Sequence, residues 1–186
     1  MLFISKGIPE KNGISAELRI VIGGQVCSVF GLEEDLWLRG RLGFAETASP
    51  DEEAAIQNLL RNGLAEYTSR KDPAARYTIL SRCMIIPSEP GKRNALAKEE
   101  KILLNWIRDA GFRLSLAELV YLFENRVRPT ARLLGEDNRQ ALTERLYPDG
   151  GIEANILEAK MASSKARDTV VDAVIGLLQK KQVVLL

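Results

Sequence analysis

The segment from residue 49 to residue 68 constrains the fold most, because it specifies a helix with both ends marked and a strand directly after it. Ser49-Pro50-Asp51-Glu52-Glu53 combines an N-cap serine, a proline at the first helical position and acids that suit the helix dipole. Apolar residues then recur at helical spacing up to Asn62, and Gly63 supplies a left-handed C-cap. We therefore predict a helix over residues 50–62 that leads into a strand over residues 64–68.

A second pattern, at residues 18–30, predicts a tight β-hairpin. The runs Leu18-Arg19-Ile20-Val21-Ile22 and Gln25-Val26-Cys27-Ser28-Val29-Phe30 are rich in β-branched residues, and only Gly23-Gly24 separates them. Glycine adopts the positive φ angles that a two-residue hairpin turn requires. The glycine pair therefore favours a turn over a phosphate-binding loop.

Residues 33–86 extend these patterns into one α+β unit. Glu33 to Leu42 is a helical candidate that precedes the helix over 50–62. After the strand over 64–68, a turn at 71–75 leads to Tyr77–Ile86, a run rich in β-forming residues. The expected order at the end of this unit is therefore helix, strand, basic-tipped turn and strand.

The segment Pro87 to Asn94 contains two prolines and a glycine among polar residues, which is typical of a linker. We expect a hairpin and a winged-helix-like unit over residues 1–86, a linker over 87–94, and a helical unit over 95–186 that ends in a short strand. Within the last unit, apolar spacing predicts helices that end near Gly111 and that cover about 116–126, 138–147, 152–162 and 167–181. Ser115-Leu116-Ala117-Glu118 matches a capping box. Residues 182–186 form a strand by composition, and we predict that this strand is paired.

Two helix-to-strand segments of the chain match each other at their apolar positions. Ala55-Ile56-Gln57-Asn58-Leu59-Leu60-Arg61-Asn62-Gly63-Leu64-Ala65 aligns with Ala173-Val174-Ile175-Gly176-Leu177-Leu178-Gln179-Lys180-Lys181-Gln182-Val183. A helix that carries Leu-Leu and is followed by a strand resembles the recognition helix and first wing strand of winged-helix domains. The resemblance covers residues 33–86 best and residues 97–186 in outline.

The resemblance implies a helix-rich α+β fold of two winged-helix-like units, the first with small antiparallel hairpins. It also implies that the helix over 50–62 enters a DNA major groove, with Lys71 and Arg76 near phosphates at the wing tip. Gln57, Asn58 and Arg61 are the residues of that helix suited to contact bases or a partner.

The chain contains no histidine, which removes many catalytic and metal-binding chemistries. Histidine is the usual general base at neutral pH, the partner of serine and cysteine nucleophiles, and a common metal ligand. No paired-carboxylate motif, P-loop or dinucleotide-binding glycine motif is present either. Cys27 and Cys83 each lie in an apolar run typical of a strand, and we interpret them as buried free thiols rather than a disulfide, because free cysteine behaves as a small hydrophobe. We therefore expect no enzymatic activity, no metal and no cofactor.

Charge provides no bulk attraction to nucleic acids, because 26 Lys and Arg residues balance 25 Asp and Glu residues. The helix over 50–62 carries Asp51, Glu52 and Glu53 at the end that would approach the bases, where acids repel DNA phosphates. The densest basic cluster comprises Arg126, Arg128, Arg132 and Arg139, and either a partner's phosphates or neighbouring acids could neutralise it. Trp37 and Trp106 could be interface anchors, but both lie on apolar helical stripes, Trp106 on one shared with Leu103 and Ile107, so we expect both in the core.

Two functions therefore remain open. The first is a non-catalytic protein-interaction or assembly module, whose partner is another protein or a second copy of the chain. The second is a winged-helix transcriptional regulator that binds duplex DNA. Residues 1–6 are too few for the apolar core of a signal peptide, and no apolar run approaches the ~20 residues of a membrane span. We expect a cytoplasmic location and no membrane partner.

Overall fold

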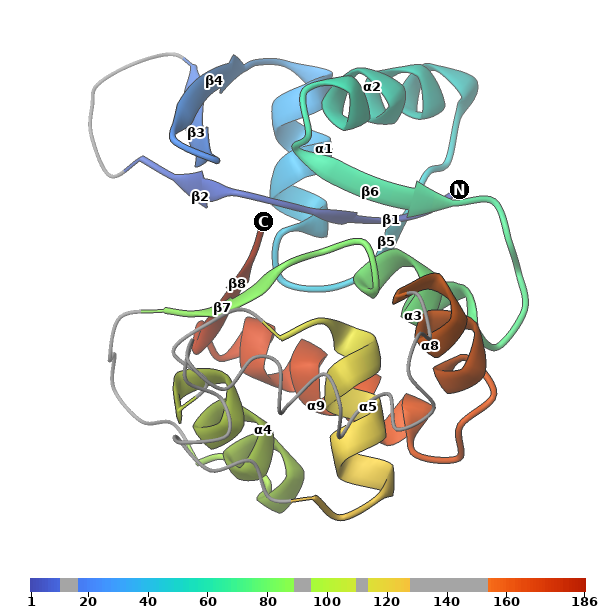
Figure 1. Ribbon diagram of the computed structural model, residues 1–186. Coiled ribbons are helices and arrows are strands. Elements are labelled where there is room, and N and C mark those ends of the chain that lie inside the picture. The colour runs from blue at the N-terminus through green and yellow to red at the C-terminus, as the bar shows by residue number, and fades with distance from the viewer. Residues whose placement is uncertain (11–16, 89–94, 110–113, 128–153) are drawn as a thin grey trace. The chain divides into compact units, whose positions relative to one another are not determined.

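The computed structural model describes residues 1–10, 17–88, 95–109, 114–127 and 154–186, which form a mixed α+β fold (Figure 1). This confirms the predicted α+β class. The chain divides into two compact units, one of Met1–Cys83 with Val184–Leu186 and one of Met84–Val183. A search of the described helices for a candidate membrane span found none.

The first unit contains a short three-stranded antiparallel sheet of order β5-β1-β6. The central strand, β1 (Leu2–Ser5), pairs with β5 (Ala45–Glu46) on one side and with β6 (Ala65–Thr68) on the other. Three helices pack against these strands: α1 (Leu32–Gly40), α2 (Pro50–Arg61) and α3 (Ala75–Leu80). Phe3 and Ile4 of β1 are fully buried, so β1 runs through the core.

The core of the first unit combines residues of its sheets with residues of α1 and α2. Its members are Phe3, Ile20, Val29, Leu36, Trp37, Ala55, Ile56, Leu59, Leu64 and Ala65. Trp37 is fully buried, and its Nε1 donates a hydrogen bond to the carbonyl oxygen of Lys6 at 2.9 Å. The indole therefore has apolar neighbours and a partner for its polar atom, which confirms that Trp37 belongs to the core.

The predicted hairpin at residues 18–30 is confirmed. β3 (Leu18–Ile22) and β4 (Gln25–Val29) pair antiparallel with Ile22 opposite Gln25, so Gly23 and Gly24 form a two-residue turn. Their φ angles are +56° and +83°, both in the region that a type I′ hairpin turn requires. β2 (Ile8–Pro9) adds a third antiparallel strand beside β3.

Both predicted ends of α2 are confirmed. The Ser49 side chain accepts a hydrogen bond from the Glu52 amide at 3.2 Å, and Pro50 occupies the first helical position. At the other end, Gly63 has a φ of +71°. The Leu64 amide donates to the Leu59 carbonyl at 2.8 Å and the Gly63 amide donates to the Leu60 carbonyl at 2.9 Å. This pair of bonds is a Schellman motif, which ends the helix and directs the chain into β6.

The prediction of a strand over Tyr77–Ile86 is wrong for most of that run. Residues 75–80 form α3, and only β7 (Ile85–Pro87) is extended. Asp72 starts the helix, because its Oδ1 accepts from the Ala74 amide at 2.8 Å and its carbonyl accepts from the Ala75 amide at 3.0 Å. The helix buries Tyr77, Ile79 and Leu80, so tertiary burial outweighs their β propensity. β6 therefore pairs with β1, and not with the strand that was expected to follow the basic-tipped turn.

The second unit contains four described helices: α4 (Lys98–Asp109), α5 (Leu116–Glu124), α8 (Ala154–Met161) and α9 (Arg167–Gln179). They agree with the predicted helices except in their exact ends. The capping box is confirmed, since Ser115 Oγ accepts from the Glu118 amide at 3.2 Å and the Glu118 carboxylate accepts from the Ser115 amide at 2.7 Å. The predicted helix over 138–147 and most of the 87–94 linker lie outside the described residues.

The C-terminal strand is paired, as predicted. β8 (Val183–Leu185) and β7 form a two-stranded sheet, and next to it the Ser88 amide donates to the Gln182 carbonyl at 2.9 Å. Pairing satisfies backbone groups that an apolar terminal strand would otherwise expose.

The two matched helix-to-strand segments end in the same local structure. α9 ends as α2 does, because the Gln182 amide donates to the Leu177 carbonyl and the Lys181 amide donates to the Leu178 carbonyl, both at 2.9 Å. Lys181 has a φ of +55°, so it occupies the left-handed position that Gly63 holds in the other segment. β6 and β8 begin at the aligned residues Ala65 and Val183. The two segments that match in sequence therefore also share their local structure.

Both cysteines are free thiols, as predicted. Cys83 is buried in a turn after α3, so its predicted place in a strand is wrong. Burial raises the pKa of its thiol to about 12, which keeps it protonated at neutral pH. Cys27 is partly buried on β4.

Candidate functional site

The polar residues expected to read DNA from α2 are exposed, but two of them bond within the protein. Gln57, Asn58 and Arg61 all lie on the exposed face of α2. Asn58 Nδ2 donates to Glu33 Oε1 of α1 at 3.2 Å, and Arg61 Nη1 donates to Asn58 Oδ1 at 3.4 Å. This chain of bonds occupies donors that base recognition would need.

Acidic groups lie at the starts of α1 and α2 in the first unit. α1 carries Glu33, Glu34 and Asp35 in its first turn, and α2 carries Asp51, Glu52 and Glu53. Arg39 Nη2 bonds Glu52 Oε2 at 2.8 Å, and this bond, with a second from the Ala48 amide, holds the pKa of Glu52 below its usual range. α1 packs against α2, so the first-turn acids of both helices lie on one pair of packed helices, where Arg39 neutralises Glu52 and the N-terminal amine neutralises Glu53.

Lys71 and Arg76 do not lie at the tip of a wing. Lys71 is exposed in the loop between β6 and α3, and Arg76 lies in the first turn of α3. The Arg76 guanidinium stands over the ring of Phe44 at 5.1 Å from the ring centroid, a cation–π contact within the first unit. Lys71 therefore lies in a loop and Arg76 in a helix, because the described residues 75–80, expected as part of a second wing strand, form α3.

Of the basic cluster in the second half, the structure describes Arg126. It follows α5 with a φ of +52° and is exposed. The Arg126 amide bonds the Phe123 carbonyl at 3.3 Å and the Val127 amide bonds the Leu122 carbonyl at 3.0 Å, so Arg126 is the left-handed residue that ends α5. Arg128 and Arg132 lie outside the described residues.

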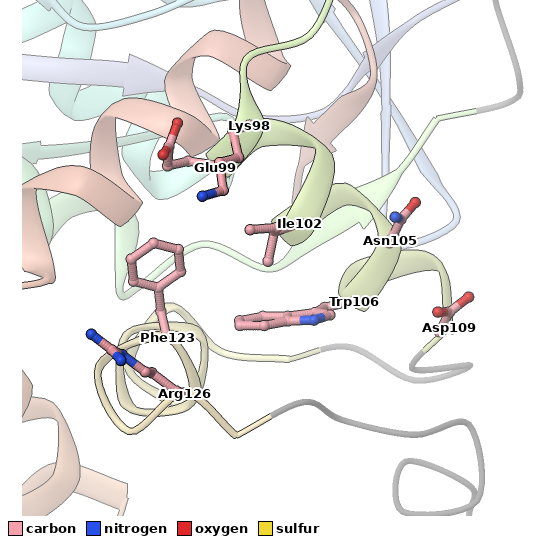
Figure 2. A pocket seen from close by; sticks show the side chains of 8 residues that line it. All are labelled: Lys98, Glu99, Ile102, Asn105, Trp106, Asp109, Phe123 and Arg126. Carbon is pink, nitrogen blue, oxygen red and sulfur yellow. The ribbon is translucent and has the colours of Figure 1, made fainter.

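A pocket of about 600 Å³ opens between α4 and the end of α5 in the second unit. Its described lining residues are Lys98, Glu99, Ile102, Asn105, Trp106, Asp109, Phe123 and Arg126 (Figure 2). Figure 2 shows the rings of Trp106 and Phe123 beside one another, with Ile102 over them and the charged side chains farther out. The two rings meet edge to face, with centroids 6.3 Å apart and an angle of 63° between their planes.

The spacing of residues along α4 creates this pocket wall. Ile102, Asn105, Trp106 and Asp109 recur every three or four residues and therefore share one face of the helix. A different face of α4 buries Glu100, Leu103, Leu104 and Ile107. The helix thus has an apolar core face and a second, partly apolar face that is open to the pocket.

The prediction that Trp106 belongs to the core is wrong. Trp106 and Phe123 are only partly buried, and both line the pocket. The sequence placed Trp106 on the same stripe as Leu103 and Ile107, but Trp106 lies closer to Ile102 around the helix. The apolar residue at position 102 was the signal that could have identified this second face.

The described side chains do not gather into a metal-binding cluster. No group of three or more Asp, Glu or Cys residues that could hold a metal ion occurs among the described residues. Cys83 remains protonated and buried, so it lacks the thiolate that nucleophilic chemistry requires. The pocket offers instead two aromatic rings with a rim of both charges, a composition suited to binding.

Comparison of the chain with protein-family models, curated proteins and solved structures found no match.

Proposed function

We propose that this protein is a non-catalytic protein-interaction module and that the pocket between α4 and the end of α5 is its binding site. The observation that carries the proposal is the pair of partly buried rings, Trp106 and Phe123, inside the recess. Tryptophan and arginine are enriched among the residues that dominate binding energy in protein interfaces. The pocket combines Trp106 with Arg126, and a pocket of about 600 Å³ has room for bulky side chains of a partner.

The charges around the pocket define the chemistry of the partner. Among the described lining residues, Lys98 and Arg126 are balanced by Glu99 and Asp109, so this part of the rim carries no net charge. A rim with balanced charges does not attract polyanions such as nucleic acids. It can form ion pairs with both acidic and basic residues of a partner, on either side of a side chain inserted into the pocket. The pocket therefore suits a polypeptide segment that inserts an aromatic or large aliphatic side chain between charged neighbours.

Site-specific photocrosslinking in the cells that make the protein tests this site. p-Benzoylphenylalanine replaces Asn105, an exposed lining residue, and in a matched control it replaces Thr169, an exposed residue of α9 that does not line the pocket. We expect a discrete adduct from position 105 and none from position 169. The same adducts from both positions would show non-specific contact and contradict the proposal.

The Trp106→Ala variant should abolish that adduct without unfolding the protein. Removing the indole eliminates the main apolar contact of the pocket, and truncating such an anchor typically costs about 2 kcal/mol of binding free energy, or about a thirtyfold loss of affinity. The loss is measured by titrating the crosslinked partner, once identified, against both proteins. Asp35→Ala, an exposed change in the first unit, is the control and should leave affinity unchanged. An unchanged affinity of the Trp106→Ala variant would contradict the assignment.

DNA binding through α2 is the alternative function, and the exposure of Gln57 and Arg61 is the observation that favours it. We expect no binding of random duplex DNA even at low salt, because acids surround the contact residues and non-specific affinity depends on phosphate neutralisation. Fluorescence anisotropy across a salt series measures this. Salt-dependent binding that Arg61→Ala weakens and Arg19→Ala leaves intact would support the regulator and contradict the interaction module.

A further inference from the structure

Strand β4 forms an open edge of its sheet. The strand order β2-β3-β4 leaves one side of β4 without a neighbouring strand among the described residues. Open edges usually carry lysine, proline or a bulge, which prevents pairing with another chain. β4, with the sequence Gln-Val-Cys-Ser-Val, carries no charge and no proline. Its five consecutive register pairs with β3 also leave no bulge in it.

The hairpin register determines which backbone groups face the open edge. Ile22 and Gln25 flank a two-residue turn, so they form a hydrogen-bonded pair, and such pairs alternate along an antiparallel ladder. Gln25, Cys27 and Val29 therefore direct their amides and carbonyls toward β3. Val26 and Ser28 direct theirs away from it, toward the open edge.

An exposed apolar row crosses the outer face of the same sheet. Ile8 pairs with Val21, and Val21 pairs with Val26, so the three side chains stand side by side across three strands. Ile8 is 42% exposed and Val26 is 47% exposed. The row ends at Val26 of β4, at the open edge of the sheet. Phe30, directly after β4, is 69% exposed, the highest value among the large apolar residues described.

We propose that β4 pairs with β4 of a second copy of this chain, antiparallel about a two-fold axis at Cys27. Val26 of each copy then lies opposite Ser28 of the other, which pairs the outward backbone groups of both strands. The same register places Phe30 of one copy opposite Gly24 of the other. No described atom lies within 4 Å of the position that a Cβ would take at Gly23 or Gly24, so the turn leaves space for the phenyl ring.

The surface around β4 is complementary to itself, and this identifies the partner of β4 as a second copy of the chain. The exposed ring and the space that accepts it belong to one strand and its turn, so a two-fold arrangement satisfies both at once. An uncharged strand also pairs with its own copy without opposing like charges. The surface belongs to the first unit and is independent of the pocket proposed above, so Trp106→Ala should leave dimerisation unchanged.

Sedimentation equilibrium of the full chain from about 1 to about 200 μM tests the dimer, because assembly depends on protein concentration. We expect a monomer–dimer equilibrium. In the variant Val26→Lys/Ser28→Lys, lysines from the two copies lie directly opposite, and the dissociation constant should rise at least about tenfold. Ala54→Lys/Gln57→Lys adds the same charges to exposed positions of α2 and should leave the equilibrium unchanged. If the double variant does not fold, Ser28→Lys alone places a lysine opposite Val26 of the other copy, and the dissociation constant should still rise.

Oxidative crosslinking tests the register. The proposed pair of Cys27 residues is of the non-hydrogen-bonded type, whose Cα atoms lie about 4.5 Å apart, within the range for a disulfide. Diamide takes one hydrogen atom from each of the two thiols as the disulfide forms. We expect a crosslinked dimer from Cys83→Ser and none from Cys27→Ser. A monomer at all concentrations, a dimer that Val26→Lys/Ser28→Lys leaves intact, or a dimer that Cys27 does not crosslink would each overturn the proposal.

Discussion

Trp37→Ala is expected to lower the free energy of unfolding of the first unit by about 4 kcal/mol, the largest effect of any single change considered. The indole is fully buried in the core of that unit, so its removal leaves a cavity among residues of both sheets and both long helices. The Lys6 carbonyl also loses the hydrogen bond from Trp37 Nε1. A loss of this size is a large fraction of the stability of a small domain.

The buried thiol of Cys83 reports on this unit, because it becomes reactive only when the unit opens. Thiol labelling across a urea series, in a Cys27→Ser background, therefore measures the stability of the first unit. Trp37→Phe is the matched control. It retains an aromatic ring but cannot donate to Lys6, so it should cost about 1–2 kcal/mol. Equal losses for the alanine and phenylalanine variants would show that indole packing does not stabilise the unit.

Gly176→Ala is expected to destabilise the second unit by about 2 kcal/mol, although alanine normally favours a helix. A Cβ at position 176 of α9 would overlap Oε1 of Glu100 on α4. Glu100 is buried and cannot move freely, because its carboxylate accepts from Lys180 Nζ at 2.5 Å and from the Ala97 amide at 2.7 Å. The methyl group must therefore separate α4 from α9 or break these bonds.

The sign of the Gly176 substitution should reverse when Glu100 is absent. In a Glu100→Ala background the overlap disappears, and Gly176→Ala should then stabilise the unit by up to about 1 kcal/mol through helix propensity. Trp106 fluorescence in a Trp37→Phe background follows urea unfolding, because Trp106 is then the only tryptophan. A double-mutant cycle gives the coupling between the two positions. Additive effects would contradict the close contact between Glu100 and Gly176.

The pocket proposed as a binding site was only partly predictable from the sequence. Arg126 was identified there as part of a basic cluster, and the structure places it on the rim of the pocket. Trp106 was expected to be buried, and the structure places it in the pocket wall together with Phe123. Periodicity indicates that a helix has an apolar face, but it does not say which of two apolar faces a neighbouring element covers.

The sequence by itself determined the features that depend on contacts between near neighbours. Ser49 and Gly63 specify the ends of α2, Gly23-Gly24 specifies the hairpin turn, and Ser115 with Glu118 specifies the start of α5. Each signal works through hydrogen bonds or φ angles within a few residues, so no distant part of the chain is needed.

Only the tertiary structure decided the features that depend on distant residues. Residues 77–80 form a helix because burial within the first unit outweighs their β propensity. β6 pairs with β1, which lies about sixty residues earlier in the sequence, rather than with the segment that follows it. Trp37 entered the core whereas Trp106 remained at a pocket, although both lie on apolar helical stripes. In each case the deciding contacts join residues far apart in the sequence, and a local pattern contains no information about which of them form.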